Sequence, residues 1–258
     1  MINSNFFIVK CIKTLKIISL YKSKPFNAMT TNKVITISQL TKDFPVGESY
    51  FRALENINLE IGEGEFTGFV GPSGSGKTTL LNIIGSLDKP TSGTAFILGN
   101  DVSKLSAKES AALRNLHIGF IFQSYNLLPI YTVYENVEFA LLLQKKSKEE
   151  RHKAVMESLE WVGLTDKKDS RPTQLSGGES QRVAIARAMV KHPTIVLADE
   201  PSANLDAENS HHILQTMARL NKELNTTFIF ATHDEKVMQY LQKIITLKDG
   251  RIESEFNK

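Results

Sequence analysis

A glycine-rich loop constrains the fold of this chain more than any other feature. The loop reads Gly71-Pro72-Ser73-Gly74-Ser75-Gly76-Lys77-Thr78. An apolar run ending at Val70 leads into it, and apolar residues at helical spacing follow Thr79. Glycines let the backbone close around an anion, and the N-terminus of the next helix adds partial positive charge. This order of strand, loop and helix predicts a nucleoside triphosphate site in an α/β domain.

Two side chains of this loop carry specific chemistry. Lys77 is predicted to reach the outer phosphates, and the Thr78 hydroxyl is predicted to bind Mg²⁺. A flexible glycine-serine turn would explain neither side chain. The predicted phosphate-binding set runs from Gly71 through Thr79.

An apolar run with an acidic end forms a second landmark. Residues 194–198 read Thr-Ile-Val-Leu-Ala and lead directly into Asp199 and Glu200. In a phosphate-loop enzyme, the first acid can hold Mg²⁺ and the second can polarise the water that attacks the γ-phosphate. Taken alone, the pair could equally cap the following helix. Together with the loop at 71–78, it predicts a hydrolytic site.

Chain length and cysteine content limit the possible architectures. The 258 residues are enough for one α/β domain, or for a core domain with a smaller lobe. No apolar run approaches the roughly 20 residues that span a bilayer, so any membrane role would come through a partner. The single cysteine, Cys11, excludes an internal disulfide framework and is typical of a reducing compartment.

Positive charge is concentrated at the front of the chain. The first 42 residues contain no acid and seven lysines, at positions 10, 13, 16, 22, 24, 33 and 42. The remaining residues carry 24 basic and 28 acidic side chains, a net charge of −4. Nucleic-acid-binding domains usually present a basic surface, so the body of this chain is not expected to bind nucleic acid.

The N-terminal segment, residues 1–33, is interpreted as an extension. Lysines interrupt its apolar stretch, unlike a secretory signal, and Lys10 before Cys11 does not fit a lipid-attachment site. A disordered extension, a true start at Met29 and a basic amphipathic helix on a membrane surface all stay open.

From Val34 onward, the chain alternates between expected strands and helices. Continuous apolar runs without alternation predict parallel strands buried on both faces. The expected strands are residues 34–37, 51–59, 65–70, 93–98, 118–122, 194–198, 227–231 and 244–247, and the expected helices include 147–161 and 180–190. One domain is predicted over residues 34–252, with a C-terminal tail at 253–258.

A third motif opens one of these helices, and it reads Leu175-Ser176-Gly177-Gly178-Glu179-Ser180-Gln181. Ser176 and the amides of Gly177 and Gly178 form a second expected anion site at a helix N-terminus. One chain does not need two sites for the same γ-phosphate. The motif resembles the signature sequence of ATP-binding cassette (ABC) ATPases, and the resemblance extends over residues 34–252.

This resemblance implies a fold, an activity and an assembly. The fold would be a P-loop NTPase (RecA-like) core of class α/β with a mostly parallel sheet, a small antiparallel β subdomain, and a helical subdomain inserted at about residues 124–176. The activity would be ATP hydrolysis with Mg²⁺. In the family, each signature sequence faces the nucleotide of the opposite subunit, so a homodimer closed head-to-tail over two ATP molecules is expected.

Further single residues match positions that the family uses around the nucleotide. Gln123 is similar to the glutamine that touches Mg²⁺ or the water and reports to the membrane partner. His233 is similar to the switch histidine at the γ-phosphate, and Asp206 belongs to a segment similar to the loop that crosses the dimer interface. Phe44 lies where the family places an aromatic, commonly tyrosine, that stacks on adenine. From the residues alone, Gln123 could end a strand, His233 cap a helix and Phe44 belong to the core.

Longer matches resemble the lipoprotein-release and macrolide-export type of ABC ATPase. They cover residues 71–77, 87–93, 119–129 and 199–206. This type works with integral membrane permease subunits, which implies ATP hydrolysis coupled to transport and a peripheral position on the cytoplasmic face of the cell membrane. Residues 126–143 lie where the helical lobe grips that partner, or are ordinary helical core.

Two other functions stay open from the sequence. A non-transport complex, such as a cell-division regulator, could use the same ATP cycle to act on its partner. A soluble ABC ATPase of translation or DNA repair usually has a second cassette, a coiled coil or a Cys-x-x-Cys hook, whereas this chain has one phosphate loop and one cysteine.

Overall fold

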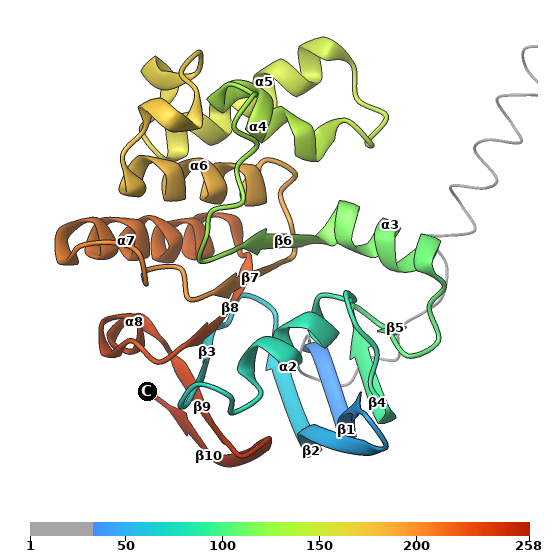
Figure 1. Ribbon diagram of the computed structural model, residues 1–258. Helices are drawn as coiled ribbons and strands as arrows, with labels where there is room; N and C mark the ends of the chain where they lie inside the picture. The colour runs from blue at the N-terminus through green and yellow to red at the C-terminus, as the bar shows by residue number, and fades with distance from the viewer. Residues whose placement is uncertain (1–32) are drawn as a thin grey trace, which may run out of the picture. The chain divides into compact units, whose positions relative to one another are not determined.

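The computed structural model describes residues 33–258, which form two β-sheets and the helices around them (Figure 1). The expectations for the N-terminal extension, including a start at Met29 and a membrane-surface helix, lie outside the described residues, apart from Lys33, which opens the first strand. Over residues 33–258, no helix combines the length and the apolar character that crossing a bilayer requires.

The larger sheet has six strands in the order β10-β9-β3-β8-β7-β6. The strands from β9 to β6 are parallel, and only β10 is antiparallel to its neighbour. The strands are β3 (Phe66–Val70), β6 (Ile118–Ile121), β7 (Ile195–Asp199), β8 (Thr227–Thr232), β9 (Lys243–Lys248) and β10 (Arg251–Asn257). Both β3 and β8 are buried along their whole length, as their apolar sequences predict.

The C-terminal strand β10 corrects the sequence prediction of a tail at 253–258. Its residues pair with β9 in a register that runs from Arg251 opposite Lys248 to Asn257 opposite Lys243. The strand is largely exposed and contains Glu253, so its composition resembles that of a solvated tail. Backbone hydrogen bonds to β9 order these residues, and composition alone does not reveal such pairing.

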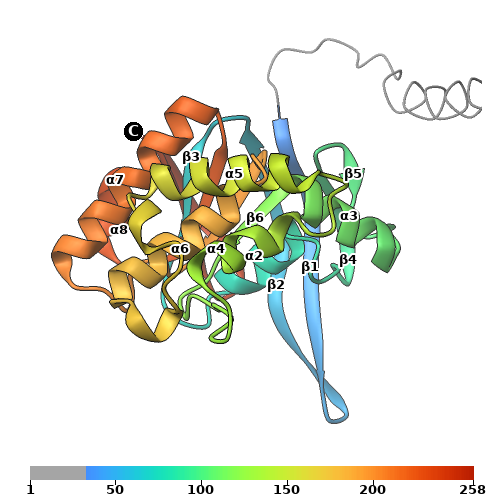
Figure 2. The ribbon, with the colours of Figure 1, turned by 90° about the horizontal axis from the view of Figure 1, so that it is seen from above.

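The smaller sheet has four strands in the order β2-β1-β4-β5, with every neighbouring pair antiparallel. The strands are β1 (Lys33–Val46), β2 (Ser49–Gly62), β4 (Ser92–Ile97) and β5 (Asn100–Asp101). The first two form a long hairpin whose tip projects beyond the neighbouring strands (Figure 2). This sheet is the antiparallel β subdomain that the sequence resemblance implies.

Helices fill the connections between the parallel strands. They are α2 (Lys77–Ile84), α3 (Ala107–His117), α4 (Val133–Glu138), α5 (Lys148–Trp161), α6 (Gly177–Met189), α7 (Ala207–Leu224) and α8 (Glu235–Tyr240), with short 3₁₀ turns at Phe139–Leu141, Thr165–Lys167 and Pro172–Gln174. The helix α6 lies at the centre of this group. It contacts α4 and α5 on one side, and β6 and α7 on the other (Figure 1).

Four helices begin with a reciprocal cap that is readable from the sequence. A serine or threonine stands at the N-cap and a glutamate follows three residues later, before α3, α4, α5 and α6. Ahead of α6, the Glu179 amide donates to Ser176 Oγ at 3.2 Å, and the Ser176 amide donates to Glu179 Oε2 at 2.8 Å. Each such box satisfies backbone donors that a helix start leaves without partners.

The two faces of the larger sheet pack into two apolar clusters. Phe66, Phe228 and Phe230 lie on one face with apolar residues of α6 and α7, and the ring centroids of Phe66 and Phe230 are 4.7 Å apart. Phe69 and Ile229 lie on the other face with α2 and the smaller sheet. Side chains alternate along a strand, so β3 and β8 each contribute to both clusters.

A buried amide fixes the loop that enters α4. Asn136 is fully buried, and its Oδ1 accepts a hydrogen bond from the Leu128 amide at 2.8 Å. Its Nδ2 donates to the carbonyl oxygens of Leu128, Tyr131 and Thr132 at 3.1, 3.2 and 2.9 Å. One side chain therefore contacts four backbone groups of an irregular segment.

Candidate nucleotide-binding site

The loop after β3 is closed by its own lysine. Gly76, the N-cap of α2, has a φ of 100°, and a Cβ there would lie 2.7 Å from the Ala53 carbonyl oxygen, so only glycine fits. The Lys77 ammonium donates to the carbonyl oxygens of Gly71 at 2.7 Å and Pro72 at 2.9 Å. These two bonds connect the first residue of α2 back to the two residues directly after β3, and they close the loop between them.

A buried cation and an unpartnered hydroxyl inside this loop suit an anionic ligand. Lys77 is 7% exposed, and burial lowers the pKa of its ammonium, although the nearby carboxylates of Glu200 and Asp199 raise it. The buried Ser75 hydroxyl has no hydrogen-bond partner among residues 33–258. A buried cation gains most from a charged oxygen partner, so phosphate oxygens fit this position.

Thr78 and Asp199 bring two oxygen groups together between α2 and β7. The Thr78 hydroxyl lies 3.1 Å from each carboxylate oxygen of Asp199. Burial raises the pKa of Asp199, the Thr78 hydrogen bond lowers it, and the charge of Glu200 raises it again. The two side chains therefore place oxygen atoms where a bound cation would offset the buried negative charge of Asp199.

The oxygen atoms of Thr78 and Asp199 suit Mg²⁺ better than they suit a metal ion whose ligands all come from the protein. Among residues 33–258 there is no group of three or more His, Cys, Asp or Glu side chains arranged to hold a metal ion. Mg²⁺ typically uses one or two carboxylates and takes its remaining ligands from water and substrate phosphates. Thr78 and Asp199 match that pattern beside the phosphate loop.

Glu200 is oriented by three contacts with β8 and the residue after it. Its amide donates to the Ala231 carbonyl at 2.9 Å, and its Oε2 accepts from the Thr232 hydroxyl at 3.1 Å. Its Oε1 lies 2.6 Å from Nδ1 of His233. Glu200 has a φ of 46°, a left-handed conformation that costs a non-glycine residue roughly 1–3 kcal/mol and occurs often at functional sites.

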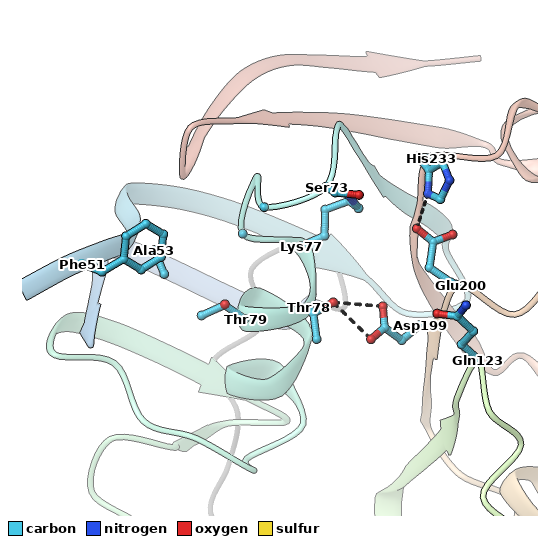
Figure 3. A pocket seen from close by; sticks show the side chains of 12 residues that line it. Phe51, Ala53, Ser73, Lys77, Thr78, Thr79, Gln123, Asp199, Glu200 and His233 are labelled. Atoms are coloured by element: carbon cyan, nitrogen blue, oxygen red, sulfur yellow. Dashed lines mark hydrogen bonds and ion pairs between the residues drawn. The ribbon is translucent and has the colours of Figure 1, made fainter. Parts of the chain in front are cut away.

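These groups line one cavity of about 530 Å³ at the carboxyl edge of the larger sheet. Its lining comprises Phe51, Ala53, Ser73, Gly74, Gly76, Lys77, Thr78, Thr79, Gln123, Asp199, Glu200 and His233. The phosphate loop lies between an apolar end and an acidic end (Figure 3). The carboxyl ends of parallel strands meet at one edge, which explains why motifs far apart in sequence converge here.

The signature residues lie outside this cavity. Ser176 caps α6 and precedes Gly177 and Gly178 in the first turn, and none of the three lines the cavity. Asp206 caps α7 through the Asn209 amide at 2.8 Å and does not line the cavity either. Ser176 Oγ accepts the helix-cap bond from the Glu179 amide, and the Ser176 hydroxyl also interacts with the Glu179 carboxylate.

The aromatic residue at the apolar end of the cavity is Phe51 and not Phe44. The two lie directly opposite each other in the β1–β2 hairpin, but only Phe51, 55% exposed, lines the cavity. The ammonium of Lys42 sits 4.8 Å from the centroid of the partly buried Phe44 ring. The sequence analysis missed Phe51, although an adjacent aromatic pair, Tyr50 and Phe51, at the start of a strand could have indicated it.

Two hydrogen bonds join the segments around the site. Asn204 Nδ2 donates to the Gln123 carbonyl at 2.9 Å, which links the segment after β7 to the end of β6. The buried Gln181 Nε2 donates to the Pro201 carbonyl at 2.7 Å, which links the signature helix α6 to the residue after Glu200. Neither link was foreseen from the sequence, because each depends on how loops meet across the sheet.

Three features of this site define a nucleoside triphosphate hydrolase. They are a phosphate loop at the edge of a parallel sheet, a pair of oxygen-bearing side chains for a cation, and an oriented glutamate. The chain belongs to the ABC transporter family, whose model matches residues 54–203. It is an ATP-binding cassette subunit with ATPase activity, and the family fold expected from the signature motif is confirmed.

Named relatives cover most of the chain. It is 45% identical to the uncharacterized ABC transporter ATP-binding protein MJ0796 of Methanocaldococcus jannaschii, over 86% of this chain and 96% of that one. It is 43% identical to the lipoprotein-releasing system ATP-binding protein LolD of Bacteroides thetaiotaomicron, over 86% of this chain and all of that one. A dimeric post-hydrolysis structure of MJ0796 bound to ADP and Pi is similar with a TM-score of 0.80 at 44% identity, covering 86% of this chain and 98% of that one.

Proposed function

We propose that two copies of this chain close head-to-tail over two ATP molecules and drive a separate membrane subunit of the lipoprotein-release or macrolide-export type. The observation that carries the proposal is the division of the motifs. The phosphate loop, Asp199 and Glu200 line one cavity, while Ser176 and the first-turn glycines of α6 lie outside it. A second copy would supply its own Ser176 to complete the site. A solved structure of the MJ0796 cassette is dimeric, which supports the pairing of two copies.

Each site residue then has a distinct proposed role. Residues 71–79 and the Lys77 ammonium bind and orient the phosphates, and Glu200 accepts a proton from the attacking water. Thr78, Asp199 and Gln123 hold Mg²⁺, which when bound neutralises charge on the phosphate oxygens. His233 positions Glu200 and meets the γ-phosphate.

The proposed dimer contacts come from residues outside the cavity, and the proposed adenine contact comes from the β1–β2 hairpin. Ser176, Gly177 and Gly178 would bind the partner copy's nucleotide, and Asp206 would lie at the dimer interface. An aromatic of the β1–β2 hairpin would meet the adenine. Phe44 remains the sequence prediction for that role, and the cavity favours its cross-strand neighbour Phe51.

The membrane partner is proposed to dock on the helical segment between Gln123 and α6. This segment, residues 124–176, contains α4 and α5 and contacts the sheet through α6. Where this segment meets β6 and α6 lies a groove of about 290 Å³ with Phe120, Phe122 and Phe139 in its lining. Partly exposed aromatic side chains in a groove are typical of a protein interface. Such docking would place the chain at the cytoplasmic face of the cell membrane.

The decisive experiment measures the mass of the Glu200→Gln chain by light scattering with and without Mg²⁺ and ATP. We expect a dimer with ATP and a monomer without it, because the variant binds ATP but does not consume it. Glu208→Gln, an exposed acid in the first turn of α7, serves as the matched control and should turn ATP over normally. A Glu200→Gln chain that stays monomeric at saturating ATP would contradict the composite site.

A further inference from the structure

The groove beside β6 combines aromatic walls with buried positive charge. It lies between β6, the edge strand of the larger sheet, the C-terminal end of α6 and the 3₁₀ turn at Phe139–Leu141. Phe120 and Phe122 stack with their centroids 5.8 Å apart, and Phe139 is 51% exposed. Arg187 and Lys191 complete this side of the lining.

Within residues 33–258, both cations donate hydrogen bonds to backbone carbonyl oxygens only. Arg187 donates to Asn126 O and Tyr125 O, each at 2.6 Å, and Lys191 donates to Arg114 O at 2.6 Å. Burial lowers the pKa of Arg187, and burial together with the charge of Arg114 lowers the pKa of Lys191 to about 8. These positive charges are therefore partly removed from water without a negative partner.

No carboxylate of the described chain compensates them. Among residues 33–258, neither Arg187 nor Lys191 forms a salt bridge, and no acid lines the groove. Glu138, the acid next to Phe139 in sequence, is already paired with Arg151 at 2.9 Å. Arg114 adds a further cation near Lys191 and donates to the Ser86 carbonyl. A desolvated cation without a counter-charge lowers stability, and an incoming carboxylate relieves that cost.

We propose that this groove receives a segment of the membrane subunit in which an aspartate or glutamate, flanked by large apolar side chains, pairs with Lys191 and Arg187. The apolar side chains pack against Phe120, Phe122 and Phe139. The carboxylate accepts hydrogen bonds from those N–H groups of the two cations that do not already donate to a carbonyl oxygen. The inference rests on the proposed function and names the chemistry of its partner. Charge complementarity selects this occupant over a purely apolar segment, which would leave both cations buried and unpaired.

The test uses the full chain, affinity-tagged and purified from detergent-solubilised membranes of its source organism. We expect Lys191→Glu to reduce recovery of the membrane subunit about tenfold or more, since reversing one charge of a desolvated pair is costly. Lys191→Arg should retain recovery. Lys145→Glu, an exposed lysine after the 3₁₀ turn, is the matched control and should behave as wild type. Basal ATPase and thermal unfolding of each isolated variant verify that the fold is intact.

A rescue experiment identifies the carboxylate. In the Lys191→Glu background, each acid in the cytoplasmic segments of the membrane subunit is replaced by lysine, and one replacement should restore recovery. Recovery of Lys191→Glu at the Lys145→Glu level, or loss of recovery that no single replacement restores, would overturn the carboxylate pairing while leaving the proposed function standing. A wild-type chain that brings down no membrane subunit would overturn both.

Discussion

The imidazole of His233 lies against the carboxylate of Glu200, with 2.6 Å between Nδ1 and Oε1. The second carboxylate oxygen accepts the Thr232 hydroxyl at 3.1 Å, so both oxygens are oriented from the end of β8. The His233 side chain is 62% exposed and the Glu200 side chain 15%, so the histidine covers the carboxylate from the solvent side. The direction in which Glu200 can accept a proton is thereby fixed before any ligand arrives.

Replacing the carboxylate tests this role directly. Glu200→Gln keeps the shape and a hydrogen-bond acceptor but cannot take up a proton, so we expect kcat to fall by about 100-fold or more. The dissociation constant for ATP should stay within about twofold of wild type. Phosphate release and fluorescence titration measure the two quantities. An unchanged kcat would remove Glu200 from the role of base.

Loss of the loop lysine should act on binding. Lys77→Ala removes the buried ammonium that closes the loop and faces the phosphates, and we expect ATP affinity to fall about tenfold or more. Isothermal titration with ATP measures the change, and Lys104→Ala, on an exposed turn, is the control. Wild-type affinity in Lys77→Ala would contradict the phosphate-loop assignment.

The two aromatics of the β1–β2 hairpin can be separated by paired variants. Phe51→Ala removes the ring that lines the cavity, and we expect ATP affinity to fall about tenfold, since stacking on a base contributes roughly 1–3 kcal/mol. Phe44→Ala should have the smaller effect. A larger loss in Phe44→Ala, measured by the same titration, would favour the sequence-based choice of adenine contact.

Stability of the segment after Gln123 depends on one amide. Asn136→Ala leaves the Leu128 amide without its partner and removes the side-chain hydrogen bonds to three carbonyl groups, so we expect the free energy of unfolding to fall by about 2–4 kcal/mol. Urea denaturation measures it. Asn100→Ala, whose exposed side chain bonds two carbonyls, should cost about 1 kcal/mol or less. Equal losses in both variants would contradict the special role of Asn136.

The lowered pKa of Lys191 predicts a specific pH dependence. Its pKa is about 8 in the folded chain against 10.5 for an ordinary lysine, so between these values the unfolded chain binds more protons. The Lys191 contribution to the free energy of unfolding therefore rises with pH through that window. We expect Lys191→Met to be more stable than wild type at pH 7, with an advantage that shrinks towards pH 10.5. Urea denaturation across this range measures the difference, and a constant difference would contradict the prediction.

The parallel sheet was predictable from sequence because buried strands are continuous apolar runs. The run expected at 227–231 forms β8 at Thr227–Thr232. In contrast, β10 depends on pairing with β9 and carries the exposed, charged composition of a loop, so sequence pattern did not indicate it. The helix α7 was also not named, although its buried apolar residues recur at helical spacing, at positions 213, 214, 217 and 220.

The acidic end of the site was more predictable than the apolar end. Motifs that follow parallel strands must meet at one sheet edge, and Thr78 does lie beside Asp199. The choice between Phe44 and Phe51 depends on which side of an antiparallel hairpin meets the cavity. Hairpin register sets that, and β1 and β2 contain several register shifts that no local pattern reveals.

The buried bond from Gln181 to Pro201 has a mechanical consequence for a pair of chains. It ties the first turns of α6 to the residue beside Glu200, so the two move as one body. In the proposed dimer, α6 of each chain rests on the other chain's ATP. Each ATP site is then connected to the other through both copies of α6, so a structural change at one site is transmitted to the other.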